Sequence, residues 1–505
     1  MNIITQNYVR NDTMCTHRAE RQRILCTKCI FYFVAKSQKV STHEKSNQKI
    51  GREQSMKKKI IALLLSCAMM ATLVGCGAKE EAAATTESAP AAEAEAAAEE
   101  AAPAAAAEGE NTLTVWCWDP AFNLNAMYEA EKVYQKDHPD FKLNVVEVPW
   151  QDIQTKITTA ATSGDYSTLP DIFLMQDNAF QKNVLAFPDL CVDLAASGID
   201  FSQFAAGKTA YSVIDGKNFG VPFDNGAVIG CYRTDVLAEA GFTVDDFTDI
   251  TWDEYLEKGK VVLEKTGKPL ISMQAGECDL IMMMLQSAGA SLFNEDGTAN
   301  IANNDVLKEV VNVYGELRTA GVLTEVNSWD EYVGSITSGN VAGTINGCWI
   351  MASIQTAADQ SGNWAITNMP KLVAANGTNY SNNGGSSWAV ASNCKNTELA
   401  FDFLASTFAG SNELYDNILP SGAIATWAPA AGSDAYGLAN DFFGGDAVSA
   451  KIVEYSTHVP TNITGAYYYE ARDAVAVAST NAINGADLQS ELDNAQAQVE
   501  GYIGQ

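Results

Sequence analysis

Hydrophobic residues downstream of position 112 alternate between short strand-like runs and a helical spacing. The runs at 113–118 and 143–148 are typical of strands, and the apolar run at 171–175 is typical of a strand buried in a parallel sheet. Between them, residues 127–134 and 153–161 place apolar side chains three or four positions apart, which is the period of one helical face. The order strand, helix, strand, helix, strand predicts an α/β fold.

A separate apolar stretch lies upstream at 60–74, and three lysines at 57–59 precede it. It is shorter than the roughly 20 residues of a membrane-spanning helix, and its basic start favours a signal peptide. The ending Leu73-Val-Gly-Cys76 resembles the lipobox of bacterial lipoproteins. This resemblance implies that residues 56–75 are removed and that Cys76 carries a diacylglycerol anchor with two acyl chains. The alternative is an ordinary signal peptide followed by an incidental cysteine.

Two segments without a folding pattern flank this signal. Residues 1–55 carry mainly basic charges and show no apolar periodicity, so we interpret them as a mis-called start before Met56. Residues 76–111 consist mainly of Ala, Glu, Thr and Pro and hold no aromatic residue. Because this composition offers no side chains for a core, we expect a tether between the lipid anchor and a folded domain at 112–505.

The charge of the chain is strongly acidic and excludes several classes of partner. The formal net charge is −30, and it becomes −39 beyond residue 75 because residues 1–75 hold 13 basic and 4 acidic side chains. An acidic surface of this kind repels nucleic acid and anionic lipid. We therefore expect no nucleic-acid partner, and a monomer that contacts the membrane only through its N-terminal lipid.

Cysteine and histidine usage gives no sign of a metal site. Six cysteines follow Cys76 at wide, irregular intervals that fit neither a disulfide scaffold nor a zinc ribbon, although two of them could pair. Only two histidines, His138 and His458, lie beyond the signal. We expect no metal, no cofactor and no catalytic residue.

The ends of the predicted strands carry the candidate binding residues. About 395 residues follow the tether, which is more than one hydrophobic core usually serves, so we expect two lobes. Ligands of open α/β sheets bind beyond the carboxyl ends of the strands. The polar and aromatic residues at such positions are Trp118, Asp119, Asp177, Asn178, Asp224, Asn225 and Trp349.

The order of several short motifs resembles a known family, the extracellular sugar-binding proteins of ABC importers that include maltose-binding protein. The motifs are Val115-Trp-x-Trp-Asp119, Pro170-Asp-Ile-Phe-x-x-x-Asp177, Gly220-Val-Pro-Phe-Asp224, Ala342-Gly-Thr-Ile-Asn-Gly-Cys-Trp349, Gly384-Gly-Ser-Ser-Trp388 and Tyr467-Tyr-Tyr-Glu-Ala-Arg472. The resemblance covers nearly all of residues 112–505.

This resemblance implies a periplasmic-binding-protein fold of type II, in which sugar binds between two α/β lobes. Three crossovers join the lobes, near 223–227, 384–388 and 420–426. The first lobe then holds about 112–223 and 389–419. The second holds about 227–384 and 427–505.

The resemblance also implies roles for individual residues. Asp177 and Asp224 fall where the family places carboxylates that accept sugar hydroxyls, and Trp349 and Tyr468 match aromatic residues that stack on sugar rings. Trp118 departs from the maltose-binding pattern, which leaves the identity of the sugar open. The complete predicted site is Trp118, Asp119, Asp177, Asn178, Asp224, Asn225, Trp349, Ser387, Trp388 and Tyr468.

Structural roles compete with ligand contact at several of these positions. Asp177 and Asp224 could instead cap following helices, and any tryptophan could belong to the core. Trp252 lies within the capping box Thr251-x-x-Glu254, and we expect it to brace the start of a helix, while Trp329 stays undecided.

The sequence therefore predicts a lipid-anchored solute-binding protein on the outer face of the bacterial cytoplasmic membrane. It would capture a neutral carbohydrate, most simply an oligosaccharide, and deliver it to the membrane subunits of an ABC permease. Neutrality is expected because few basic residues lie near Asp119, Asp177 and Asp224 in the sequence. The alternatives are a surface adhesin and a surface glycoside-active enzyme, which needs two carboxylates about 5–10 Å apart, whereas Asp177 and Asp224 follow different strands.

Overall fold

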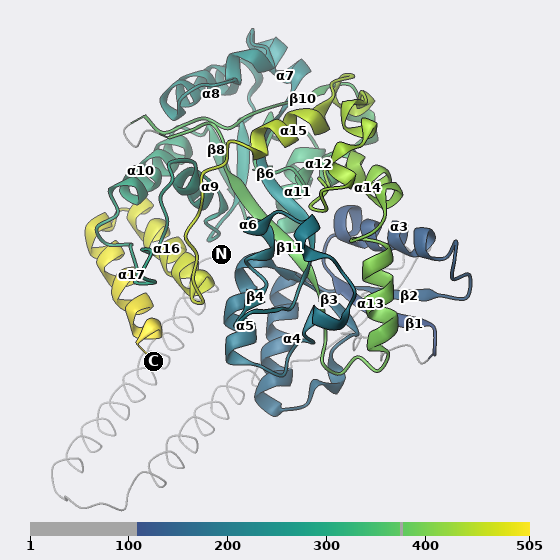
Figure 1. The fold of residues 1–505 in the computed structure, drawn as a ribbon. Helices are drawn as coiled ribbons and strands as arrows, with labels where there is room; N and C mark the ends of the chain where they lie inside the picture. The colour runs from purple at the N-terminus through teal and green to yellow at the C-terminus, as the bar shows by residue number, and fades with distance from the viewer. Residues whose placement is uncertain (1–108, 374–376, 505) are drawn as a thin grey trace, which may run out of the picture. The chain divides into compact units, whose positions relative to one another are not determined.

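A computed structural model describes residues 109–373 and 377–504, and Figure 1 shows its fold. The predictions for residues 1–55, for the signal at 56–75 and for Cys76 lie outside the described residues, as does most of the predicted tether. Among the described helices, none has both the length and the apolar character needed to cross a membrane.

The predicted alternation of strands and helices is confirmed at the start of the described region. Three parallel strands open the sheet with the first in the middle, namely β1 (Thr112–Cys117), β2 (Lys142–Glu147) and β3 (Ile172–Gln176). The connecting helices are α3 (Asn125–Tyr134) and α4 (Trp150–Ser163). Each strand lies within two residues of the run that predicted it.

Helices cover both faces of this part of the sheet. Val115 and Trp116 are neighbours on β1, but they belong to different apolar clusters, because successive side chains of a strand point to opposite faces. One cluster takes residues from α3, α13 (Thr397–Ser406) and α14 (Asn412–Ile418). The other takes residues from α4 and α5 (Phe180–Ala186). The remaining short elements of this lobe are α6 (Ala206–Thr209), β4 (Val213–Ile214) and β5 (Lys217–Asn218).

Two long antiparallel strands carry the chain between the lobes, β6 from the first to the second and β11 back to the first. β11 (Asn382–Val390) pairs with β3, and it also pairs with the first half of β6 (Val221–Arg233). The second half of β6 pairs with β9 (Gly343–Gly347) and β10 (Trp364–Thr367). The crossovers predicted near 223–227 and 384–388 fall within β6 and β11, where the register between the two strands shifts.

Close approach of the two backbones explains a glycine at this crossover. A Cβ atom on Gly226 would lie 2.1 Å from the carbonyl oxygen of Asn383. The third predicted crossover, 420–426, touches the same region, since the Thr426 hydroxyl donates to the Pro222 carbonyl at 3.1 Å. The division of the chain between the lobes at these points stays a prediction.

The second lobe is mainly helical around a small parallel strand pair, β7 (Ile271–Gln274) and β8 (Leu323–Val326). Its helices are α7 (Thr234–Ala240), α8 (Trp252–Thr266), α9 (Asp279–Ser287), α10 (Asp305–Thr319), α11 (Trp329–Thr337), α12 (Ile350–Gln355), α15 (Val448–Ser456), α16 (Tyr468–Ile483) and α17 (Leu488–Ile503). Figure 1 shows α16 and α17 side by side next to α10.

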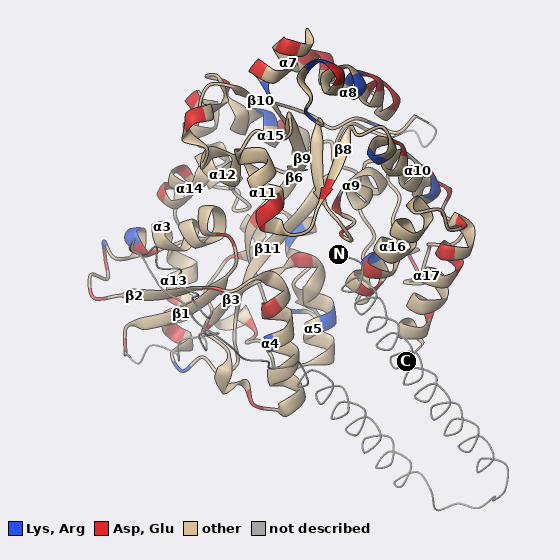
Figure 2. Cartoon of the chain, turned by 180° about the vertical axis from the view of Figure 1, so that it is seen from behind, with Lys and Arg blue, Asp and Glu red and all other residues tan. Residues whose placement is uncertain are grey.

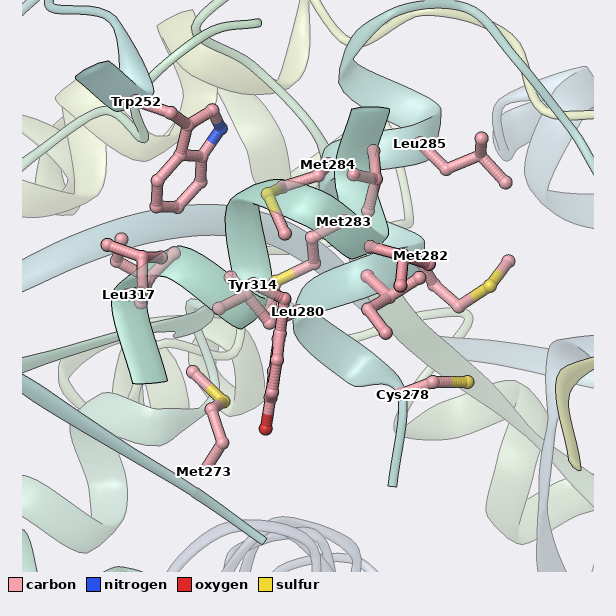
Figure 3. Close-up of a cluster of buried hydrophobic side chains, with 14 of the residues drawn as sticks. Trp252, Met273, Cys278, Leu280, Met282, Met283, Met284, Leu285, Tyr314 and Leu317 are labelled. Carbon is pink, nitrogen blue, oxygen red and sulfur yellow. The ribbon is translucent and has the colours of Figure 1, made fainter. Parts of the chain in front are cut away.

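A large apolar core holds α8, α9, α10 and α16 together. Figure 3 shows Met283 and Met284 of α9 on the side of the helix that faces Trp252 and Tyr314. The predicted capping box at the start of α8 is confirmed, because Thr251 accepts from the Glu254 backbone amide while the Glu254 side chain accepts from that of Thr251. Trp252 is buried beside this cap, as expected of a structural residue.

The six cysteines of the described region are all free and buried, namely Cys117, Cys191, Cys231, Cys278, Cys348 and Cys394. The pairing that their number allowed is therefore absent among the residues described. Figure 2 shows acidic positions spread over the helices of both lobes and fewer basic ones, in line with the net charge of −30.

Candidate functional site

Asp177 stands directly after β3, as predicted, and is only 5% exposed. Its Oδ1 accepts a hydrogen bond of 3.0 Å from the Ser387 hydroxyl on β11. Its Oδ2 forms an ion pair with Nζ of Lys208, which also donates to the Ser386 carbonyl at 2.9 Å. These contacts come from a lysine and a neighbouring strand, so the helix-cap alternative does not describe Asp177.

Asp224 lies on β6, on the other side of β11. Its Oδ1 accepts from the Ser386 backbone amide at 2.8 Å and from the Ser386 hydroxyl. Ser386 is the register partner of both Gln176 on β3 and Asp224 on β6. The two aspartates are thus neighbours across one strand, which corrects the inference that different strand ends keep them apart.

Burial and local charge set the protonation of these carboxyls. Burial raises the pKa of Asp177 to about 6, the Lys208 ammonium acts against this rise, and the charge of Asp224 adds to it. Burial also raises the pKa of Asp224, and Lys208 again opposes the shift. Nearby, burial and the Asp177 charge raise the pKa of Tyr211 to about 12.

Few basic residues lie near Asp177 in the sequence, but the fold brings a lysine to it. Lys208 lies 31 residues beyond Asp177 in the chain, and its side chain is 11% exposed. Sequence reasoning missed it because the four-residue helix α6 that carries it has no strong pattern. The only sequence signal for Lys208 was its position shortly before the strand-like run at 220–223.

Aromatic rings form two groups that reach the strands next to these carboxylates, through Tyr469 at Gln176 of β3 and through Trp349 at Asn383 of β11. Trp118 at the end of β1 lies 5.3 Å from Trp150, measured between ring centroids, and Trp150 lies 6.2 Å from Tyr469 of α16. In the second group, Trp349 lies 5.7 Å from Trp329, which is 38% exposed. Both groups contain half-buried rings, which is the kind of surface that can stack against a flat ligand.

Trp349 follows β9 and packs against the cores of both lobes. Its indole Nε1 donates to the Asn383 carbonyl at 2.9 Å, which fixes the ring against β11. Asn225 is half-buried one residue beyond Asp224, and its carbonyl accepts from the Cys348 thiol at 3.2 Å. Within the described residues, the buried Oδ1 of Asn178 has no hydrogen-bond partner.

Two predicted site residues have structural positions instead. Trp388 is fully buried, and the centre of its ring lies 5.3 Å from that of Phe223 and 5.4 Å from that of Phe408. It is therefore a core residue, and the prediction that it contacts the ligand is wrong. Asp119 is 8% exposed, and its Oδ1 accepts from the backbone amides of Ala121 and Phe122. Those contacts make Asp119 the cap of the short helix that follows it.

Helix α16 brings the second lobe to the first. Tyr468 begins the helix and is half-buried, and its neighbour Tyr469 donates from its hydroxyl to Oε1 of Gln176 at the end of β3. Glu470 forms an ion pair with Lys182 on α5. The sequence prediction chose Tyr468, whereas Tyr469 makes the contact with the first lobe.

Arg472 anchors this end of α16 to the second lobe. Its guanidinium pairs with the carboxylates of Glu277 and Asp279, the latter at 2.7 Å. The thiol of Cys278 donates to the Arg472 carbonyl at 3.3 Å. Because Arg472 is only 16% exposed, these ion pairs hold the first turn of α16 in a fixed position.

The fold and this arrangement define a class of protein. A family model for the bacterial extracellular solute-binding proteins matches residues 129–430, and the chain belongs to that family. This confirms the resemblance drawn from the motifs. Since the family and its curated relatives are binding proteins, it also confirms the prediction that the chain is not an enzyme.

Curated relatives resemble the chain over most of its length. The lactose-binding protein of Rhizobium radiobacter is 36% identical over 392 residues, which cover 77% of this chain and 93% of that protein. The arabinooligosaccharide-binding protein of Bacillus subtilis is 27% identical over 317 residues, covering 60% and 70%.

Solved structures show the same two-lobed fold. The ABC transporter associated binding protein from B. animalis subsp. lactis, solved with β-1,6-galactobiose, has a TM-score of 0.66 at 20% identity and covers 78% of this chain and 97% of its own. The GacH receptor of Streptomyces glaucescens has a TM-score of 0.65 at 17% identity and covers 78% and 98%. The predicted periplasmic-binding-protein fold is confirmed.

Proposed function

We propose that this protein is a lipid-anchored binding protein that captures a neutral carbohydrate between its two lobes and delivers it to an ABC importer. One observation carries the proposal, namely the pair of buried carboxylates of Asp177 and Asp224, flanked by half-buried aromatic rings from both lobes. The proposed site residues are Trp118, Asp177, Asn178, Asp224, Asn225, Trp349, Ser387 and Tyr468.

The chemistry of a sugar fits these side chains. Its hydroxyls donate hydrogen bonds to carboxylate and amide oxygens, and its C–H faces pack on aromatic rings. Asp177 Oδ1 receives one hydrogen bond, from Ser387, and a carboxylate oxygen can accept two. Hydrogen bonds to a charged group contribute about 1.5–3 kcal/mol each, so two such acceptors support specific binding of hydroxyls.

The charge of the site favours a neutral ligand. Two carboxylates face one ammonium, that of Lys208, so the trio keeps a net negative charge when both Asp177 and Asp224 are ionised. An anionic ligand entering this buried space would meet repulsion that solvent screens poorly. A neutral sugar avoids this repulsion, and its hydroxyls can donate hydrogen bonds to the same carboxylates.

The relatives suggest where to look for the ligand. The names of the curated relatives refer to lactose and to arabino- and galactooligosaccharides, and one structural neighbour was solved with a galactobiose. We infer that the ligand is a disaccharide or short oligosaccharide, with lactose as the first candidate. Closure of the lobes around it would create the form that the permease recognises.

Anchoring and location rest on the sequence. The basic start, the apolar stretch and Cys76 support a lipid-modified N-terminus on the outer face of the cytoplasmic membrane. A monomer tethered there could meet the permease without leaving the membrane surface.

Titration calorimetry tests the binding function. The full-length chain, purified in mild detergent, is titrated with lactose, β-1,6-galactobiose, an arabinooligosaccharide and an acidic digalacturonate. We expect saturable binding of at least one neutral sugar and no release of reducing ends. Preference for the acidic sugar would refute the proposal of a neutral ligand. Released reducing ends would instead support the alternative function of a glycoside-active enzyme.

A further inference from the structure

Lys208 lies inside the proposed site, although it belongs to neither lobe's core. Its ammonium pairs with Asp177 Oδ2 and donates to the Ser386 carbonyl, so two of its three N–H donors are engaged. Its side chain is 11% exposed, so solvent competes little for these bonds. The lysine therefore touches both the β3 carboxylate and the strand that separates it from Asp224.

Several titratable groups face Asp177 from the elements packed around it. Lys208 and Tyr211 approach from the segment around α6, Asp224 from β6 and Tyr469 from α16. From β11, the Ser387 hydroxyl also donates a hydrogen bond to Asp177. Lys208 carries the positive charge among these groups, and it lies between two carboxylates whose mutual repulsion disfavours ionisation of both.

The backbone beside the lysine leaves no room for adjustment. Gly385 has φ near +114°, and a Cβ atom there would lie 2.6 Å from Asp177 Oδ2 and 3.2 Å from Lys208 Nζ. The ammonium, the carboxylate and β11 therefore pack against one another directly. A side chain that keeps the volume of lysine but loses its charge would leave the carboxylate in place without its ammonium partner.

We propose that Lys208 is a positioning residue that keeps Asp177 ionised and oriented, so that its free lone pairs accept hydrogen bonds from ligand hydroxyls. The proposal rests on the carbohydrate-binding function and names the group that sets its selectivity. Without Lys208, the carboxyl takes up a proton, and one of its acceptor positions becomes a donor. The site then loses its preference for ligands that donate.

The direction of the pKa shift agrees with this role. Burial raises the pKa of Asp177 to about 6 even though Lys208 lowers it, so removal of Lys208 moves the pKa higher still. In the wild type, sugar affinity should fall as pH drops through about 6. In a variant without the ammonium, the same fall should occur at a higher pH.

The experiment uses the full-length chain in mild detergent, titrated with lactose from pH 5 to pH 8.5. The variants are Lys208→Met, which removes the charge, and Lys208→Arg, which keeps it. Lys132→Met serves as the control, because Lys132 is 66% exposed in a surface pair with Glu129. Each variant is also made together with Asp177→Asn, which cannot ionise.

We expect Lys208→Met to weaken lactose binding at pH 7 by about ten- to a hundredfold, the equivalent of one hydrogen bond to a charged acceptor. Its pH midpoint should move upward, Lys208→Arg should restore most of the affinity, and Lys132→Met should change neither. In the Asp177→Asn background, Lys208→Met should have almost no further effect. An equal loss in that background would mean that Lys208 binds the sugar itself or only supports the fold, and it would overturn the proposal.

A measurement without sugar separates this proposal from the binding function. Since the pKa of Asp177 is raised by folding, the native state holds this proton to a higher pH than the unfolded chain, and the contribution of Asp177 to stability falls as pH rises from about 4 to about 6. Urea unfolding measures this contribution as the difference between each protein and its Asp177→Asn counterpart, and in Lys208→Met the difference should extend to higher pH. Unchanged profiles would refute the role of Lys208, whereas a shifted profile in a protein that binds no sugar would refute only the proposed function.

Discussion

Tyr469 on α16 donates a hydrogen bond to Gln176 at the end of β3, and this bond joins the two lobes at the proposed site. Tyr469 also packs beside Trp150 of the first lobe. The ion pairs of Arg472 hold the start of the same helix against the second lobe. A contact of this kind exists only while the lobes are together, so it should favour the closed form.

The first prediction is that Tyr469→Phe weakens sugar binding about two- to tenfold, which corresponds to one neutral hydrogen bond. The ring remains and keeps its packing, but the closed form loses its bond to Gln176, so the equilibrium shifts toward the open form. Calorimetry with lactose gives the affinity, and stopped-flow tryptophan fluorescence should show faster dissociation. Tyr128→Phe is the matched control, since Tyr128 is 43% exposed on α3. If the affinity for lactose and the dissociation rate are unchanged, the bond from Tyr469 to Gln176 does not stabilise the closed form.

The opening α/β unit could be predicted because its information is local. Strand β1 is rich in β-branched and aromatic residues, β3 begins with a continuous apolar run, and the capping box at Thr251 and Glu254 is a four-residue signal. Each depends on neighbours in the sequence, so periodicity and side-chain chemistry were sufficient. The position of Asp177 directly after β3 followed from the same reasoning, whereas Asp224 lies inside β6, which continues to Arg233, and does not follow the end of a strand as predicted.

The partners within the site could not be predicted, because they depend on packing between distant segments. Ser387 and Trp388 are consecutive on β11, so their side chains point to opposite faces, yet both are fully buried because helices cover both faces. From the sequence, Trp388 was predicted to contact the ligand. The pairing of Lys208 with Asp177 has the same origin, since only the fold brings α6 to β11.

The second prediction compares Trp349 with Trp388. Trp349→Ala should lower sugar affinity by about 1–3 kcal/mol, about ten- to a hundredfold, because its half-buried ring is available to a ligand, and it should lower the melting temperature less than Trp388→Ala does. Trp388→Ala should instead lower the free energy of unfolding by about 3–5 kcal/mol, because it opens a cavity beside Phe223 and Phe408. Calorimetry and thermal unfolding of both variants distinguish these roles. A large fall in melting temperature for Trp349→Ala would show that Trp349 is a core residue and not a ligand contact.

The third prediction concerns the anchor. Cys76→Ala removes the thiol that lipidation requires, so the variant should appear in the medium or remain as an uncleaved precursor. Fractionation of cells followed by immunoblotting measures this. Cys191→Ala is a suitable control, because that thiol is buried inside the first lobe. If the Cys76 variant is processed and stays with the membrane as the wild type does, the lipobox interpretation is wrong.

The last prediction tests the charge of the site through Asp177. Asp177→Asn keeps the shape and one acceptor oxygen but removes the charge, so it should weaken binding of a neutral sugar by about tenfold or more. The same change leaves Lys208 without its carboxylate partner and reduces the repulsion of an anion, so binding of digalacturonate should be unchanged or improved. Asp165→Asn is the control, because Asp165 caps a surface turn and asparagine also caps well. Calorimetry on neutral and acidic sugars decides the matter, and equal weakening of both classes would show that the Asp177 charge does not select the ligand.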